Sequence, residues 1–250
     1  MFLIYGVFFP ALRILSLFYT APLLNSTLID RKIKLVIAFS ISWLFSFFLP
    51  KIDIVIFSMD GFLIILEQIF IGMSLGFTMQ LIFSSIIMCG ELISLQMGLS
   101  FSSLFDIHSR SNMSPVSRFL YVFFVLLFFQ WNGHIWMFSV LFDTFLTFPI
   151  KKLSFDINIL LSIVNFYKYI FFDSLMLLYP ILIIQLMFSL SMGILNRISP
   201  QVSIFSIGFT VILLVGMVSL FLFIPIFPSF CFFSFNRLQS FVLVLFNINR

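Results

Sequence analysis

The chain has 250 residues, of which 62% are hydrophobic and only 9% are charged, and its formal net charge is +4. This composition excludes a water-soluble protein, whereas uncharged runs of roughly 20 residues suit membrane helices. The positive charges are scattered among the ends of those runs, which excludes a basic groove for nucleic acid. We therefore expect an all-α integral membrane protein in contact with the lipid bilayer.

Charged residues divide the chain into hydrophobic runs that predict about six to seven helices. The runs are 14–29, 35–50, 68–90, 119–142, 174–196 and 198–236. As a helix, residues 35–49 would rise only about 22 Å, which is short of the ~30 Å hydrocarbon core. The run 198–236 is too long for one crossing and is interrupted by Pro225 and Pro228. Some segments are therefore expected not to cross the bilayer simply.

A basic cluster early in the chain indicates its orientation. Arg31, Lys32 and Lys34 follow the first run, and positive residues favour the cytoplasmic side of a membrane. This placement puts the N-terminus outside the cytoplasm. Lys151 and Lys152 then fall on the opposite side, a conflict that disappears if some segments pack inside protein and never face lipid.

The sequence Gly-Met-Ser-Leu-Gly at 72–76 formally matches the nucleophile elbow of hydrolases. That motif needs a strand before the serine and a base beside it, whereas this one lies within a helical run. Glycines four residues apart instead predict a helix-packing seam at Gly72 and Gly76. The two histidines, His108 and His134, do not have the spacing of metal ligands. We therefore expect no catalytic residue, no metal and no cofactor.

A polar stripe follows the run 68–90. If this region is one helix, five residues share a single face, namely Glu91, Ser94, Gly98, Ser102 and Asp106. Their spacings are three, four, four and four residues, as the helical period requires. The opposite faces hold Leu92, Ile93, Leu95, Leu99, Phe101 and Leu104. A charge inside a membrane helix costs about 2.5–3.5 kcal/mol and is kept where it has a partner or water. The stripe therefore predicts a pore lining or a contact with another subunit.

A second polar stripe lies on the helix predicted after Pro180. Its members, at spacings of four, four and three, are Gln185, Ser189, Gly193 and Asn196. Such a stripe favours packing on neighbouring helices or the lining of a conduit. Arg197 comes next, shortly before Pro200, where the helix should end. Its guanidinium is expected to meet orphan carbonyls and neighbouring acids, which is a structural role.

Two separated blocks of residues resemble one family. The first is Gly-Glu-Leu-Ile-Ser-Leu-Gln-Met-Gly-Leu-Ser-Phe at 90–101, followed by Asp106. The second consists of Pro180, Asn196-Arg197, Pro200-Gln201, Phe205, Gly208-Phe209 and Gly216. Together with Arg13, Pro22 and Arg31, they are similar to the FliR family of flagellar biosynthesis proteins, the export-gate subunits of type III secretion. Three residues depart from the family's common pattern, namely Ile107, Ser203 and Phe209.

The resemblance implies one membrane domain of helical hairpins over 1–250, with a FliP-like part at about 1–168 and a FliQ-like hairpin at about 169–250. It implies assembly with FliP-like and FliQ-like subunits and other export-apparatus proteins. The resulting gate would lie in the bacterial inner membrane at the flagellar basal body. In that membrane, the orientation inferred from the basic cluster puts the N-terminus of this chain in the periplasm. It would pass unfolded flagellar proteins, and this chain would catalyse nothing.

Other interpretations remain open. A subunit of a virulence-type injectisome is the alternative within the family. A polytopic small-molecule transporter is less favoured because no internal repeat is evident in the sequence. Helix-packing or structural roles are expected for Gly72, Gly76, Gln185, Arg197, Pro200, Gln201 and Gly208.

Residues 105–117 are expected to plug the closed gate. The segment is rich in serine and contains Pro115, which predicts a loop. The polar stripe leads directly into it, and the family resemblance places a pore-obstructing loop at this point. The plug candidates are Phe105, Ile107, His108 and Met113. The alternative is a simple connection between two helices.

Overall fold

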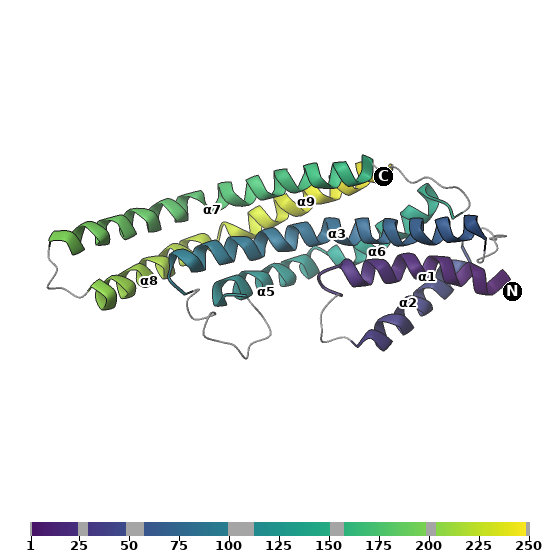
Figure 1. Cartoon of the computed structure of the whole chain (residues 1–250), viewed down its shortest axis with the longest axis horizontal. Helices are drawn as coiled ribbons and strands as arrows, with labels where there is room; N and C mark the ends of the chain where they lie inside the picture. The colour runs from purple at the N-terminus through teal and green to yellow at the C-terminus, as the bar shows by residue number, and fades with distance from the viewer. Residues whose placement is uncertain are drawn as a thin grey trace. The chain divides into compact units, whose positions relative to one another are not determined.

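The computed structural model describes residues 2–24, 30–48, 58–99, 113–150, 158–198 and 204–248, and the regular structure within these ranges is entirely helical. The helices are α1 (Phe2–Thr20), α2 (Arg31–Ser46), α3 (Met59–Gln96), α5 (Pro115–Gln130), α6 (Gly133–Thr147), α7 (Asn158–Ile198), α8 (Ile204–Phe223) and α9 (Phe227–Leu245) (Figure 1). The all-α class is thereby confirmed.

The described ranges hold more helices than the six to seven expected, because a second run is divided besides 198–236, which was expected to break. The run 119–142 breaks between α5 and α6, where Asn132 has a φ of 54°. Asparagine is among the few residues other than glycine that adopt this left-handed conformation readily, so it ends one helix and precedes the next. Sequence periodicity did not show this break, because the residues on both sides are equally apolar.

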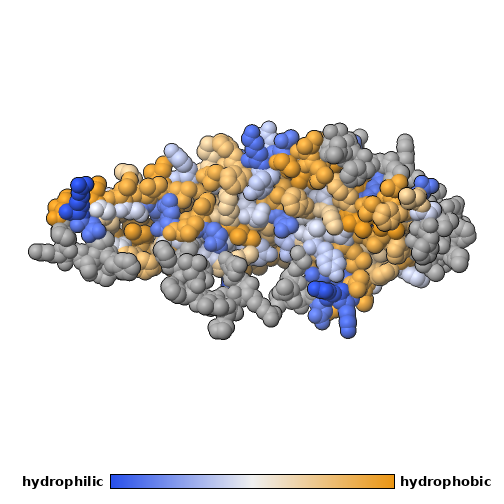
Figure 2. Space-filling model, viewed as in Figure 1, coloured by the Kyte–Doolittle hydropathy of each residue, from blue (hydrophilic) through white to orange (hydrophobic). Residues whose placement is uncertain are grey.

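Two helices in the described ranges are long and apolar enough to cross a membrane, α3 with 38 residues and α7 with 41. The number rises to four if α5 with α6 and α8 with α9 each form one interrupted span. Hydrophobic side chains cover much of the face seen in Figure 2. Phe221 is 74% exposed and Met187 is 62% exposed. Apolar surface on this scale is typical of a protein that meets lipid or other membrane subunits.

The chain forms two compact units, and neither is a continuous stretch of sequence. The first contains Met1–Leu81, Trp131–Tyr167 and Asn236–Arg250, and the second contains Ile82–Gln130 and Lys168–Phe235. Helices α3, α7 and α9 therefore contribute residues to both units. The division near residue 168 that the family resemblance implies stays a prediction.

In the first unit, α1 packs along α2. The Ser42 hydroxyl of α2 donates a hydrogen bond to the Val7 carbonyl of α1. The ring of Phe45 meets the rings of Phe142 and Phe145 on α6, at centroid distances of 5.4 and 5.8 Å. Polar and aromatic contacts thus join α1, α2 and α6.

In the second unit, phenylalanine rings join α3, α5 and α9. The Phe83 ring lies 4.8 Å from that of Phe124 and 5.6 Å from that of Phe128. Phe128 in turn meets Phe235, with 5.5 Å between the ring centroids. These are edge-to-face pairs, which contribute about 0.5–1.5 kcal/mol each beyond the apolar area that they bury. All four of these phenylalanines are buried, so aromatic contacts form part of the core of this unit.

Candidate functional site

The first polar stripe lies where α3 ends, and α3 ends earlier than expected. Its last helical residue is Gln96, and Gly98 has a left-handed φ of 75°. The expectation of one continuous helix through Asp106 is therefore wrong at Gly98, because a left-handed residue interrupts the helical period. Glu91 and Ser94 remain on α3. Several predicted residues lie outside the described ranges, namely Ser102, Phe105, Asp106, Ile107, His108, Pro200 and Gln201.

Backbone hydrogen bonds show why α3 stops there. The Leu99 N–H donates to the Ser94 carbonyl at 3.0 Å, and the Gly98 N–H donates to the Leu95 carbonyl at 3.1 Å. This pair of bonds is a Schellman motif, which satisfies the last carbonyls of a helix and places glycine at its left-handed position. A glycine just after an apolar run is a recognised stop signal, and the sequence contained it.

Helix α8 packs closely on this turn of the second unit. A Cβ atom on Gly98 would lie 2.9 Å from Cε2 of Phe209, and one on Gly216 would lie 2.8 Å from Cε of Met97. Both distances are too short for carbon atoms that do not share a bond. The missing side chains of the two glycines therefore allow the end of α3 to meet α8. Ser94 is fully buried in the same region.

Glu91 reaches from α3 to the beginning of α5. Its Oε1 accepts a 2.8 Å hydrogen bond from the backbone N–H of Ser114. The Ser114 hydroxyl oxygen accepts a 3.3 Å hydrogen bond from the N–H of Ser117. The Ser117 hydroxyl donates in turn to the Ile87 carbonyl of α3 at 2.9 Å. The carboxylate expected to line a pore or touch another subunit thus has a partner within this chain.

The second polar stripe lies on a helix with little cover of its own. In the apolar part of α7, only 17% of the residues are buried. Gln185 is an exception, since its side chain is fully buried and its amide atoms have no hydrogen bond within the described part of the chain. The Ser189 hydroxyl donates to the Gln185 backbone carbonyl at 2.9 Å. A Cβ atom on Gly193 would meet no atom within 4 Å. The face around Gly193 is therefore open.

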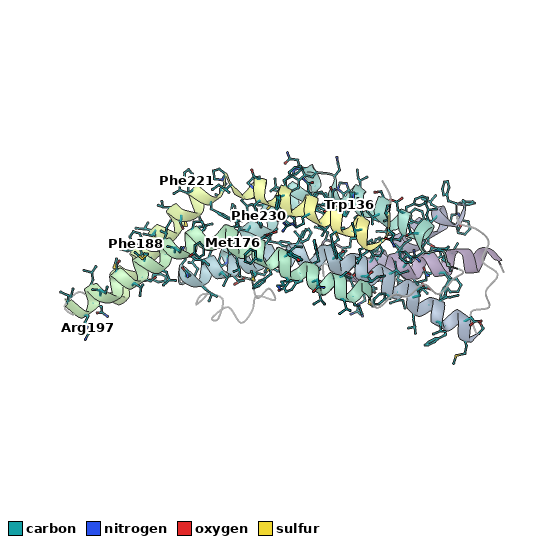
Figure 3. All side chains as sticks on the ribbon, turned by 90° about the horizontal axis from the view of Figure 1, so that it is seen from above. Trp136, Met176, Phe188, Arg197, Phe221 and Phe230 are labelled. Carbon is teal, nitrogen blue, oxygen red and sulfur yellow. The ribbon has the colours of Figure 1, made fainter. Side chains whose placement is uncertain are left out.

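Two predicted structural residues, one near the end of α7 and one within α8, differ in exposure. Arg197 is exposed and lies at the end of α7, beyond Phe188 and Met176 on the same helix (Figure 3). Gly208 is buried on α8. Its burial agrees with a packing role, whereas the acidic and carbonyl partners expected for Arg197 stay a prediction.

A buried guanidinium in the first unit was not recognised as a central residue from sequence. Arg13 is fully buried. Its Nε donates to Oε1 of Gln68 on α3 at 2.9 Å, and Nη1 donates to the backbone carbonyl of Thr144 on α6 at 2.8 Å. Nη2 donates to the Phe148 carbonyl at 3.1 Å. The guanidinium carbon Cζ lies 4.3 Å from the centroid of the Phe145 ring. A lone arginine in an apolar run was the signal in the sequence.

The glycine seam lies beside this arginine. A Cβ atom on Gly72 would overlap the Arg13 carbonyl, and one on Gly76 would lie 2.9 Å from Cβ of Thr20. Helix α1 therefore runs close against α3 at both glycines. Ser74, between them, is buried, and its hydroxyl donates to the Ile71 carbonyl of its own helix at 2.8 Å. This contact is that of a structural serine.

Long apolar helices with exposed hydrophobic side chains define an all-α integral membrane protein. The chain belongs to the bacterial export proteins, family 1, whose family model matches residues 4–238. It is 67% identical over 244 residues to the flagellar biosynthetic protein FliR of Buchnera aphidicola subsp. Baizongia pistaciae, covering 98% of this chain and 95% of that protein. The corresponding protein of Escherichia coli K12 is 39% identical over 224 residues, which cover 90% and 86%.

A virulence-associated relative is more distant. The surface presentation of antigens protein SpaR of Shigella flexneri is 26% identical over 211 residues, which cover 84% of this chain and 80% of SpaR. The FliR relatives, which match 98% and 90% of this chain, confirm the resemblance along nearly its whole length.

Proposed function

We propose that the chain is a subunit of the flagellar type III protein export gate and is needed for flagellum assembly. The observation that carries the proposal is the 67% identity to a FliR protein over 95% of that protein's length. The injectisome alternative is less well supported, because the identity to SpaR is 26%. The test is to express the chain in a flagellated bacterium that lacks its own FliR subunit. Restored flagella support the proposal, and a correctly inserted chain that restores none refutes it.

The proposed partners are FliP-like and FliQ-like membrane subunits, together with other export-apparatus proteins. The largely uncovered apolar part of α7 supports this assembly, since only 17% of its residues are buried within the chain. Purification of the chain from detergent-solubilised membranes should recover several FliP-like and FliQ-like subunits. Recovery of the folded chain alone under conditions that preserve other gate complexes would contradict the partnership.

The proposed orientation has the N-terminus in the periplasm of the inner membrane. Arg31 and Lys32, two of the three residues of the basic cluster, are exposed at the start of α2, which supports this orientation, whereas Lys34 is buried. Single cysteines placed at Arg31 and at the N-terminus can be labelled with a thiol reagent that does not cross the membrane. Labelling of the N-terminal cysteine alone in intact spheroplasts supports this orientation, and the opposite pattern reverses it.

The proposed plug is the segment 105–117, most of which lies outside the described ranges. The expected loop is wrong over 115–117, because these residues form the first turn of α5. The support for the rest of the segment is positional, because it lies between the turn at Gly98 and the Ser114 cap of α5. A channel for unfolded chains must be closed at rest, or the ion gradient would dissipate. Deletion of residues 107–113 should leave assembly intact and depolarise the membrane. A variant that assembles, exports and stays tight would show that the segment is not the plug.

A further inference from the structure

We infer that Glu91 is a positioning residue: it completes the N-terminal cap of α5 from α3 and so sets where α5 begins. Its effect on export rests on the proposed function, whereas the cap concerns the chain alone. The Glu91 carboxylate accepts the Ser114 N–H at 2.8 Å, and Ser114 is the residue that precedes the first residue of α5.

Helix α5 carries only half of a capping box in its own sequence. Ser114 is the N-cap residue, since its hydroxyl oxygen accepts the Ser117 N–H at 3.3 Å, and Pro115 occupies the first helical position, where proline is favoured. In a complete box, the third helical residue is Glu or Gln, whose side chain returns to accept the N–H of the N-cap residue. That third residue is Ser117, and its hydroxyl donates to the Ile87 carbonyl instead.

The Ser114 N–H therefore needs an acceptor from elsewhere. Ser114 is fully buried, so bulk water does not supply one, and an unpaired buried N–H costs about 1–3 kcal/mol. Glu91 supplies it from the neighbouring helix. A carboxylate is also the favourable charge at a helix N-terminus, where backbone N–H groups carry partial positive charge.

Three contacts with the start of α5 lie on one face of α3. Gly90 and Glu91 follow Ile87 by three and four residues, which places all three on the same side of the helix. The Ile87 carbonyl binds the Ser117 hydroxyl, Glu91 binds the Ser114 N–H, and a Cβ atom on Gly90 would lie 2.8 Å from the backbone nitrogen of Ser117. The face fits α5 in one register, because a shift by one turn would break both bonds and bring a side chain to the glycine position.

Hydrogen exchange of the first turn of α5 tests the cap in the assembled, detergent-solubilised complex. The informative amides are those of Ser114, Ser117 and Arg118, the last of which donates to the Ser114 carbonyl at 2.9 Å. Glu91→Leu should speed their exchange about tenfold, equivalent to about 1.4 kcal/mol. The matched control is Leu95→Ala on the same helix end, since the Leu95 side chain is 58% exposed. It should leave the exchange of α5 unchanged.

Two conservative variants separate the hydrogen bond from general packing or charge. Glu91→Gln keeps the length and an acceptor oxygen, so exchange should stay within about threefold of the unmodified chain. Glu91→Asp keeps the charge but is one methylene shorter, so it should lose about as much protection as Glu91→Leu. This pair decides the question even if Glu91→Leu fails to accumulate.

The inferred cap is overturned if Glu91→Asp leaves the exchange of the first-turn amides of α5 unchanged, whether or not Glu91→Gln speeds it. Export of flagellar subunits by the same variants is a separate readout. Glu91→Gln should export more than Glu91→Asp. If the unmodified chain fails to restore export at all, the proposed function fails, while the exchange result still decides the cap.

Discussion

Removal of the buried Arg13 guanidinium should destabilise the first unit more than most single substitutions in the chain. Arg13→Ala takes a charged donor from Oε1 of Gln68 and from the backbone carbonyls of Thr144 and Phe148. It also removes the cation that interacts electrostatically with Glu67, whose side chain is 4% exposed. Helices α1, α3 and α6 lose their common contact.

The expected loss follows from the groups left behind. Breaking a buried charged network by removing one member costs about 3–5 kcal/mol, because the remaining polar groups stay buried without compensation. For a domain of this size, that corresponds to a fall in Tm of roughly 6–20 °C. Arg13→Lys keeps the charge but presents one ammonium group, which does not reach three separated acceptors as the planar guanidinium does. The Tm of Arg13→Lys should therefore lie between those of Arg13→Ala and the unmodified chain.

Thermal unfolding of the purified complex in detergent measures this loss. Arg31→Ala is the matched control, because Arg31 is exposed at the start of α2 and should change Tm little. Adding Glu67→Gln to Arg13→Ala should recover part of the stability that Arg13→Ala loses, since the second change removes the acidic group that had interacted with the Arg13 cation. The reasoning is refuted if Arg13→Ala lowers the free energy of unfolding by less than about 1 kcal/mol. It is also refuted if Arg13→Lys has the same Tm as the unmodified chain.

Three further substitutions test local features. Gly98→Ala should cost about 1–2 kcal/mol in thermal unfolding, because its φ of 75° disfavours a side chain and the new Cβ would meet Phe209; an unchanged Tm would contradict the turn. Gly72→Ala should reduce recovery of folded protein, since its Cβ would overlap the Arg13 carbonyl, whereas Gly193→Ala, which meets nothing within 4 Å, should not. Equal recovery of these two variants on size-exclusion chromatography would contradict the seam. Arg197→Ala should leave the helical circular dichroism unchanged and lower the yield of assembled complex, with partial rescue by Arg197→Lys; full assembly of both variants would count against its role.

The class of protein and most of its helices follow from local properties of the chain. A membrane segment must satisfy its own backbone hydrogen bonds, so long uncharged runs predict helices without knowledge of their neighbours. The family was also accessible, because its residues stand in two blocks of sequence. Glycines at 72 and 76 indicated a close approach, although not that α1 is the helix that approaches.

Helix ends and the partners of charged side chains depended on residues distant in sequence. Gly98 fits equally well as a small residue on a helical stripe, and its left-handed turn is accompanied by the packing of α8 against it. Glu91 meets an N–H 23 residues away, and Arg13 meets a carbonyl 131 residues away. Composition and spacing show that a buried charge requires partners, but its partners are set by which helices meet, since a hydrogen bond acts only over the last few ångströms.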